Sequence, residues 1–450
     1  MQQLALNASI KKQTTQGREQ QVFAIAHSMR GSFVAKPLAI TDMTTSIQLW
    51  NKQIVSRASM AGLGATLIGN GIGRFAYIAL MPALIQSGWF SESDASYLGV
   101  ATLIGYIAGA PAANLLLRYF SSGLLIRSAM LISTFSYLAC AWQDAPLSWF
   151  YIWRTLAGVT GALLMVAAPP VIVRQFSSDV KARVSGVVFS GIGIGAMLSG
   201  TLLPALISYD LISAWVGMGA VALVTTILTW NAWDTRIPPT NAAYVQASFS
   251  QLSQPQVKNV ILISLAYSLC AIGYLPHTLF WVDYLVRELG MSFTSGGFFW
   301  ATFGVGAAMG PLITGSLGDK FGLKRSLCIA FSFKAAGVAI PLLSAHPFLL
   351  FISSLLVGIF TPGIVTLVST YTLECVGYEL HTKAWSGMTL AFAISQGVGG
   401  FLMAYFLSHL ASYNTLFALS ANALVLSLVC ILSTSTHCAE QTQSANNSMK

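Results

Sequence analysis

Twelve long apolar runs constrain the fold of this chain more than any other feature. Each is close to the roughly 20 residues that an α-helix needs to cross about 30 Å of hydrocarbon. Only 8% of all residues are charged, which suits burial of the runs in lipid. Lipid offers backbone N–H and C=O groups no partner, so we expect every run to be helical. The runs lie roughly at 59–85, 95–117, 123–142, 147–172, 184–208, 212–233, 259–286, 294–315, 324–345, 347–371, 384–409 and 413–433.

Lys and Arg residues are distributed unevenly between the two ends of the runs. Outside the runs almost all of them lie in the N-terminal segment and in the loops on the same side, with Arg287 as the exception. Cytoplasmic loops are enriched in Lys and Arg. We therefore expect both termini to be cytoplasmic, in an inner or plasma membrane. The formal charge of +9 then reflects topology, and we expect no nucleic-acid partner.

The chain also repeats itself at an offset of about 200 residues. Pro111 recurs as Pro311, and Gly158 recurs as Gly358. Many secondary transporters consist of two six-helix halves that hold the substrate at their interface. This pattern predicts five parts: a partly disordered N-terminal extension (1–56), a first half (57–233), a cytoplasmic linker (234–258), a second half (259–433) and a cytoplasmic tail (434–450).

A polar segment separates the eighth and ninth runs. It reads Gly315-Ser-Leu-Gly-Asp-Lys-Phe-Gly-Leu-Lys-Arg-Ser-Leu327 and resembles the G-x-L-x-D-x-x-G-x-[KR]-[KR] loop signature of the major facilitator superfamily (MFS). The resemblance implies an all-α integral membrane fold of twelve helices in two six-helix pseudo-repeats. It also implies a cytoplasmic gating latch formed by Gly315, Asp319, Gly322, Lys324 and Arg325. Alternatively, this charged turn only fixes the topology.

Two further motifs carry the resemblance. The first run contains Gly69-Asn-Gly-Ile-Gly-Arg-Phe-Ala-Tyr77, which resembles the YbfB/YjiJ branch of the superfamily over about residues 57–435. This branch implies a secondary active transporter but no particular substrate. The glycines could suggest a dinucleotide-binding loop, yet no strand precedes them. In the fourth run, Arg154-Thr-Leu-Ala-Gly158-Val-Thr-Gly161 resembles an element in which an intramembrane arginine precedes small residues.

Polar and aromatic residues in the first and seventh runs predict a central binding site. Within each run they follow helical spacing and would share one face. An ionised arginine at the centre of a span costs on the order of 3 kcal/mol, so Arg74 needs a cavity or a partner. We interpret it as a ligand for a carboxylate or phosphate of the substrate; alternatively it is structural, bonded to backbone carbonyls or tyrosine hydroxyls. The predicted substrate-binding residues are Asn70, Arg74, Tyr77, Tyr274, His277 and Trp281.

Coupling to protons needs a titratable group inside the bundle, and there are few candidates. His277 can titrate near physiological pH, although a lone intramembrane histidine can be purely structural. Arg154 could bias proton release from a neighbouring carboxylate, as the resemblance implies, or snorkel outward. Asp283 is the third candidate, but an i, i+4 ion pair with Arg287 would explain it without transport. The resemblance places Lys334, within the ninth run, at the periphery of the bundle.

These features together predict a monomeric transporter that works by alternating access. We expect proton-coupled efflux of a small molecule, preferably an organic anion, and no catalytic activity. The six cysteines have no metal-ligand spacing, so we expect neither metal nor cofactor. The alternatives are a membrane sensor or receptor on the same scaffold that does not transport, and an exporter of cationic or neutral amphipathic compounds.

Overall fold

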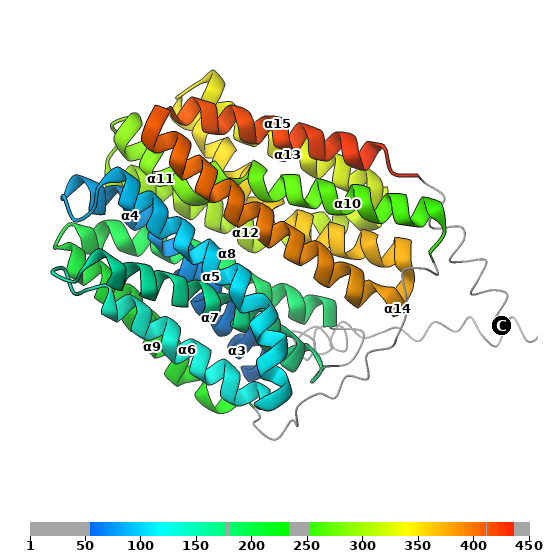
Figure 1. Ribbon diagram of the computed structural model, residues 1–450, viewed down its shortest axis with the longest axis horizontal. Coiled ribbons are helices and arrows are strands. Elements are labelled where there is room, and N and C mark those ends of the chain that lie inside the picture. The colour runs from blue at the N-terminus through cyan, green and yellow to red at the C-terminus, as the bar shows by residue number, and fades with distance from the viewer. Residues whose placement is uncertain (1–54, 177–180, 234–251, 411, 436–450) are drawn as a thin grey trace, which may run out of the picture. The chain divides into compact units, whose positions relative to one another are not determined.

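The computed structural model describes residues 55–176, 181–233, 252–410 and 412–435 (Figure 1). Twelve helical spans within these ranges are long and apolar enough to cross a membrane, which confirms the prediction of twelve spans. The predicted N-terminal extension, most of the linker and most of the tail lie outside the described residues.

The first six spans are built by eight helices and a short 3₁₀ turn. They are α3 (Arg57–Thr66), the π-helix η1 (Leu67–Ala76), α4 (Tyr77–Gln86), α5 (Glu92–Tyr119), α6 (Ser122–Ala139), α7 (Leu147–Val173), α8 (Lys181–Ile207), α9 (Leu211–Thr229) and η2 (Trp230–Ala232). The last six spans are built by α10 (Gln254–Gly273), the π-helix η4 (Pro276–Phe280), α11 (Trp281–Asp283), the π-helix η5 (Tyr284–Glu288), α12 (Phe293–Phe321), α13 (Leu323–Leu343), α14 (Pro347–Leu410) and α15 (Tyr413–Leu432).

The spans form two groups that follow the order of the chain. Figure 1 shows the blue to green helices on one side and the green to red helices on the other. In the first group α7 packs against α5 and α6, and in the second group α14 packs against α12 and α13. The two groups meet where α8 packs against α12 and where α5 packs against α14.

Small residues allow the helices of the two groups to approach closely. A Cβ atom on Gly200 of α8 would lie 2.5 Å from the carbonyl oxygen of Gly297 on α12. A Cβ atom on Gly193 would lie 2.5 Å from the carbonyl oxygen of Gly304, again on α12. Small residues at such interfaces let helix backbones pack tightly in lipid. The glycine-rich sequence of the fifth span therefore serves contact between the groups.

Gly158 and Gly358 make equivalent contacts within the two groups. A Cβ on Gly158 of α7 would meet the Thr102 carbonyl oxygen of α5, closer than the 3.0 Å limit of real Cβ contacts. A Cβ on Gly358 of α14 would similarly meet the Phe303 carbonyl oxygen of α12. The internal sequence repeat thus has a structural counterpart at these two crossings.

We expect Gly158→Ala to destabilise the protein by about 1–3 kcal/mol, because the new methyl group forces the backbones of α5 and α7 apart. Thermal denaturation of the purified protein in detergent measures the effect. Gly387→Ala is the matched control, since a Cβ there has nothing within 4 Å. Equal melting temperatures for the two variants would contradict close packing at Gly158.

The connection between the eighth and ninth spans differs from the sequence-based expectation. The segment predicted as a loop at 315–327 is mostly helical: α12 continues to Phe321, and α13 begins at Leu323. Gly322 alone makes the turn, with φ 80° and ψ 154°, a conformation that favours glycine. The tenth and eleventh spans, Pro347–Gly377 and Lys383–His409, share the label α14 but are two helices, separated at Gly377, whose φ of 72° and ψ of 173° are not helical.

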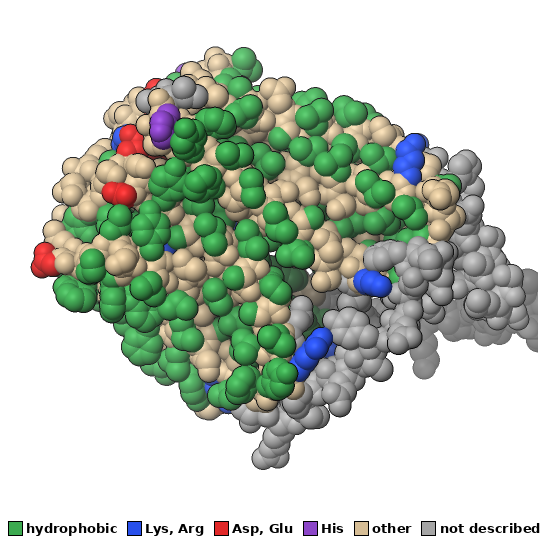
Figure 2. All heavy atoms as spheres, in the orientation of Figure 1, with side chains coloured by type: hydrophobic (Ala, Val, Ile, Leu, Met, Phe, Trp, Pro, Cys, Tyr) green, Lys and Arg blue, Asp and Glu red, His purple; other side chains and the backbone are tan. Residues whose placement is uncertain are grey.

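Charged side chains gather at opposite ends of the described spans. On the face drawn in Figure 2, Lys and Arg lie towards one end and Asp and Glu towards the other. The N-terminal turn of α5, with Glu92 and Asp94, is capped by the Ser91 side chain. The opposite end carries Lys320, Lys324 and Arg325 at the turn between α12 and α13. This asymmetry matches the uneven distribution of basic residues along the sequence.

Candidate functional site

The motif of the first span forms a π-helix, η1, held between α7 and α8. A Cβ on Gly69 would lie 3.3 Å from the Cα of Gly161 on α7. A Cβ on Gly71 would lie 2.8 Å from the Cα of Gly195 on α8. The alternating glycines therefore allow two helices to pack directly on η1. Short π-helical segments often occur at functional sites.

Donors from neighbouring helices bond to the backbone carbonyls of η1. The Tyr137 hydroxyl of α6 donates to the Ile72 carbonyl oxygen. The Arg154 Nη1 of α7 donates to the Gly73 carbonyl oxygen at 3.3 Å. These bonds fix the backbone immediately before Arg74.

Arg154 lies in a cage of aromatic rings and does not snorkel to the surface. Its side chain is 2% exposed, and its guanidinium carbon lies 4.4 Å from the ring centroid of Tyr77 and 5.8 Å from that of Tyr137. A guanidinium at these distances gains cation–π attraction. The Tyr77 hydroxyl donates to the Ala95 carbonyl oxygen at 2.8 Å. Tyr77 therefore joins the Arg154 cluster, whereas the predicted α-helical spacing would have placed it beside Arg74.

Arg74 crosses from the first group of helices to the second. Its Nη1 donates to Gln396 Oε1 of α14 at 3.0 Å, and Gln396 Nε2 donates to the Tyr274 hydroxyl. Tyr106 of α5 interacts with both Arg74 and Asn70. These contacts bring three of the predicted residues together: Asn70, Arg74 and Tyr274.

The Nε and Nη2 atoms of Arg74 have no hydrogen-bond partner within the described residues, and both atoms are buried. These two nitrogens form one edge of the guanidinium, the edge that can hold a carboxylate with two parallel hydrogen bonds. The described ion pairs involve Arg287 only, so no acidic side chain in this part of the chain neutralises Arg74. An unpaired buried donor of this kind costs free energy, and an anion bound to it would remove that cost. The residues therefore fit an anion.

His277 and Trp281 lie together inside the second group of helices. Their rings stack with centroids 4.2 Å apart, and both side chains are fully buried. The His277 Nε2 bonds to Ser353 Oγ at 2.8 Å, and the Trp281 Nε1 donates to Ser354 Oγ at 3.0 Å. The structure therefore encloses both rings among helix contacts and does not place them against Arg74.

Lys334 lies inside the bundle, so the expectation of a peripheral position is wrong. Its side chain is 0% exposed, and its Nζ lies 3.4 Å from Cys270 Sγ. Nζ also lies 4.4 Å from the ring centroid of Tyr274, the residue bonded to Gln396. The ninth span, α13, packs against α14 and α15.

Asp283 pairs with Arg287 as the spacing predicted, with 3.2 Å between Asp283 Oδ2 and Arg287 Nη1. The network is larger than that pair. Arg287 Nη2 reaches Glu92 Oε2 of α5 at 2.9 Å, and the Tyr413 hydroxyl of α15 donates to Asp283 Oδ2. We call these four residues the end network. It joins the two groups of helices at the end where α5 begins.

The residues of the predicted cytoplasmic latch lie at the other end of the spans. Asp319 is exposed and forms no ion pair within the described residues. Lys324 Nζ donates to the Leu432 carbonyl oxygen at 3.1 Å, which ties α13 to α15. Gly315 and Gly322 have open space around the position of a Cβ. Arg325 is exposed. Among the described residues the two groups are therefore joined by the ion pair of Arg287 with Glu92 in the end network, whereas Asp319 forms no ion pair.

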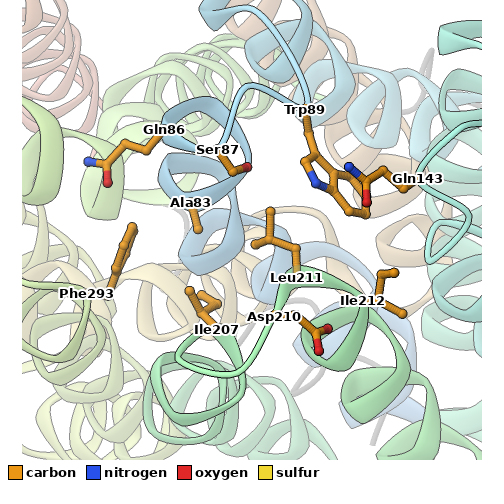
Figure 3. A pocket seen from close by; sticks show the side chains of 10 residues that line it. All are labelled: Ala83, Gln86, Ser87, Trp89, Gln143, Ile207, Asp210, Leu211, Ile212 and Phe293. Atoms are coloured by element: carbon orange, nitrogen blue, oxygen red, sulfur yellow. The ribbon is translucent and has the colours of Figure 1, made fainter.

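A separate pocket of about 420 Å³ opens at the end of α4 and the start of α9 (Figure 3). Trp89 and Gln143 lie on one side of it, and Asp210 lies beside Leu211. Arg74 and Gln396 do not line this pocket. It therefore differs from the site that sequence and hydrogen bonding indicate.

Sequence reasoning missed several residues of the candidate site. Gln396 is a lone amide in an apolar span, and its 2% exposure leaves its side chain to bond Arg74 and Tyr274. Tyr106 and Glu92 also contact the predicted residues. A polar residue inside an apolar run was the available signal for Gln396, since such residues face the bundle interior.

Fold and site together define a membrane transporter of the MFS type. A bacterial homologue of the human lysosomal transporter Spinster, inward-facing and unoccupied, matches with a TM-score of 0.62 and 16% identity, over 86% of this chain and 96% of that one. An outward-facing bacterial homologue of the iron transporter ferroportin matches with a TM-score of 0.58 and 16% identity, over 85% and 100%. At this identity the likeness concerns the fold alone.

The chain belongs to the family described as uncharacterised MFS-type transporter YbfB, whose model matches residues 66–432. This confirms the family resemblance drawn from the motifs. The protein is thus a multi-pass membrane protein, and its described residues form twelve membrane-spanning helices in two six-helix pseudo-repeats. No curated protein sequence matches the chain.

Proposed function

We propose that this protein is a monomeric secondary active transporter that exports a small organic anion by alternating access, coupled to protons. The membrane is the inner or plasma membrane, and both termini face the cytoplasm. The observation that carries the proposal is the free edge of Arg74, whose Nε and Nη2 atoms are buried without a partner in the described part of the chain.

The surroundings of Arg74 support a carboxylate as the anionic group. Gln396 holds Nη1 at 3.0 Å and so orients the guanidinium plane. The remaining edge presents two donors at the spacing of the two oxygens of a carboxylate. Substrate sites of such transporters lie between the two halves, near the membrane midplane. Arg74 and Gln396 belong to opposite halves, so a bound anion would contact both.

Aromatic rings near Arg74 favour an anion that also carries an apolar body. The guanidinium carbon lies 5.3 Å from the ring centroid of Phe75. Tyr274 lies beside Phe392, with ring centroids 6.2 Å apart. Small-molecule sites commonly combine apolar and aromatic walls with a few polar groups that orient the ligand. Benzoate is therefore a suitable first probe, with lactate and succinate beside it.

Alternating access is supported by the unequal ties between the halves. The end network joins Glu92 of α5 to Arg287 of η5, whereas Asp319 at the opposite end is exposed and has no ion pair among the described residues. Opening one end while the other end stays closed is the motion of a rocking bundle.

Transport by the purified protein in liposomes tests the proposal. Liposomes loaded with labelled benzoate, lactate or succinate should lose the label faster when the protein is present. Export should depend on an imposed pH difference. Protein-independent release of all three anions, together with protein-dependent release of a cationic dye, would refute the anion proposal.

A further inference from the structure

Lys334 is a buried basic residue that the proposed substrate contacts do not use. Its side chain is 0% exposed, within the second six-helix half. Nζ lies 3.4 Å from Cys270 Sγ and 4.4 Å from the Tyr274 ring centroid. Within the described residues no carboxylate forms an ion pair with it. An ammonium ion in this position has therefore lost its water without gaining a counter-ion.

Few titratable groups face Lys334 from the elements packed around it. The thiol of Cys270 lies on α10, Tyr274 follows at the end of that helix, and His277 on η4 is close enough to experience the charge of Lys334. On α14 the Ser353 hydroxyl bonds His277 and donates to the Gly337 carbonyl oxygen of α13 at 2.6 Å, and no α14 residue in the described chain forms an ion pair with Lys334. In the described chain, α12 and α15 make no hydrogen bond or ion pair with Lys334.

Tyr274 connects Lys334 to the proposed anion site. One face of its ring lies against Nζ of Lys334, and its hydroxyl accepts a hydrogen bond from Gln396, which in turn holds Arg74. Only the ring of Tyr274 and the amide of Gln396 would therefore connect Lys334 to an anion bound on the free edge of Arg74. Charges separated by protein interior attract one another more strongly than they do in water.

We propose that Lys334 takes up the transported proton, and that it does so when the anion binds beside Arg74. The inference rests on the proposed function, because it needs an anion at that site. In the empty site Lys334 is the neutral amine. A proton from water then forms a new N–H bond, and the resulting ammonium supplies a second positive charge next to the bound carboxylate. On release of the anion the proton returns to water.

Coupling of this kind is reciprocal, because anion and proton each raise the affinity for the other. A monocarboxylate and its proton then cross the membrane as a neutral pair. Such a pair leaves the cell whenever the combined gradients of anion and proton point outward. His277 is the competing candidate, yet among the described residues its hydrogen bond to Ser353 stays within the second half and does not reach Gln396 or Arg74.

Calorimetric titration of the purified full-length protein with benzoate tests the inference. Two buffers with different ionisation enthalpies give the number of protons taken up for each benzoate bound. For the wild type we expect uptake approaching one proton, with the affinity falling about tenfold per pH unit at the alkaline end of a range from about pH 6 to pH 9. In Lys334→Met we expect no proton uptake and an affinity that does not change with pH.

Two further variants guard against a folding defect in Lys334→Met. Lys334→Arg keeps a permanent charge, so it should bind benzoate without taking up a proton. His277→Asn should still take up the proton. Three outcomes would each overturn the inference and leave the anion site standing. Proton uptake could persist in Lys334→Met, or it could disappear only in His277→Asn. It could also be absent from the wild type although benzoate binds. If benzoate, lactate and succinate all fail to bind the wild type, the anion site itself is refuted and the inference falls with it.

Discussion

Arg74→Ala is expected to abolish benzoate export and to weaken benzoate binding by about 100-fold or more, with normal abundance in the membrane. A hydrogen bond to a charged group contributes about 1.5–3 kcal/mol, and each 1.4 kcal/mol changes affinity tenfold. The substitution removes the two free donors, Nε and Nη2, that the structure leaves for the anion. Arg74→Lys keeps the charge but loses the planar pair of donors, so it should bind with intermediate affinity.

Arg127→Ala is the matched control for Arg74→Ala. Arg127, in the second turn of α6, bonds to the carbonyl oxygens of Trp230 and Trp233 at 2.9 and 2.8 Å and not to Gln396. It should keep the wild-type affinity for benzoate. If Arg74→Ala and Arg74→Lys both disappear from the membrane while Arg127→Ala remains, the arginine is architectural and anion recognition is wrong.

The second large effect is expected at the end network. Arg287→Gln breaks the bond to Glu92 on α5 and leaves Asp283 without its ion-pair partner. The arginine side chain is 23% exposed, so water screens part of the loss, and we expect the closed state of this end to lose about 1–2 kcal/mol. The end should open roughly 5- to 30-fold more often.

Labelling of a cysteine at position 96 by a membrane-impermeant maleimide measures that opening. Ser96 is 2% exposed and lies one turn after Glu92 on α5. Ser96→Cys should react faster when combined with Arg287→Gln, after correction for the native cysteines. The control is Glu288→Gln, which changes an exposed neighbour of Arg287 that forms no ion pair among the described residues. Equal labelling rates in the two double variants would contradict a closing function for Arg287.

The positions of the spans could be predicted from sequence because lipid imposes one simple condition on each run. A run of about 20 apolar residues must satisfy its own backbone and is therefore helical. The ion pair of Asp283 with Arg287 was also predictable, since it depends only on helical spacing. These are local properties that one segment determines by itself.

The arrangement of the site depended on contacts between distant segments. Tyr77 could not be assigned correctly by α-helical spacing, because η1 is a π-helix whose carbonyls bond to Tyr137 and Arg154. Gln396 lies 322 residues after Arg74, and neither residue predicts the other. The same applies to Glu92 and Arg287, which are 195 residues apart. Burial of Lys334 likewise results from the packing of whole helices and not from its own sequence neighbours.

The most direct test of an anion site at Arg74 is a thermal-shift measurement on the purified protein at two pH values. A ligand that binds only the native state raises the apparent melting temperature by mass action. The account predicts that benzoate or another small carboxylate raises it in the wild type and Arg127→Ala, more at the lower pH, and not in Arg74→Ala. Stabilisation by a cationic or neutral compound that is unchanged in Arg74→Ala, with no effect of any carboxylate, would contradict the central claim.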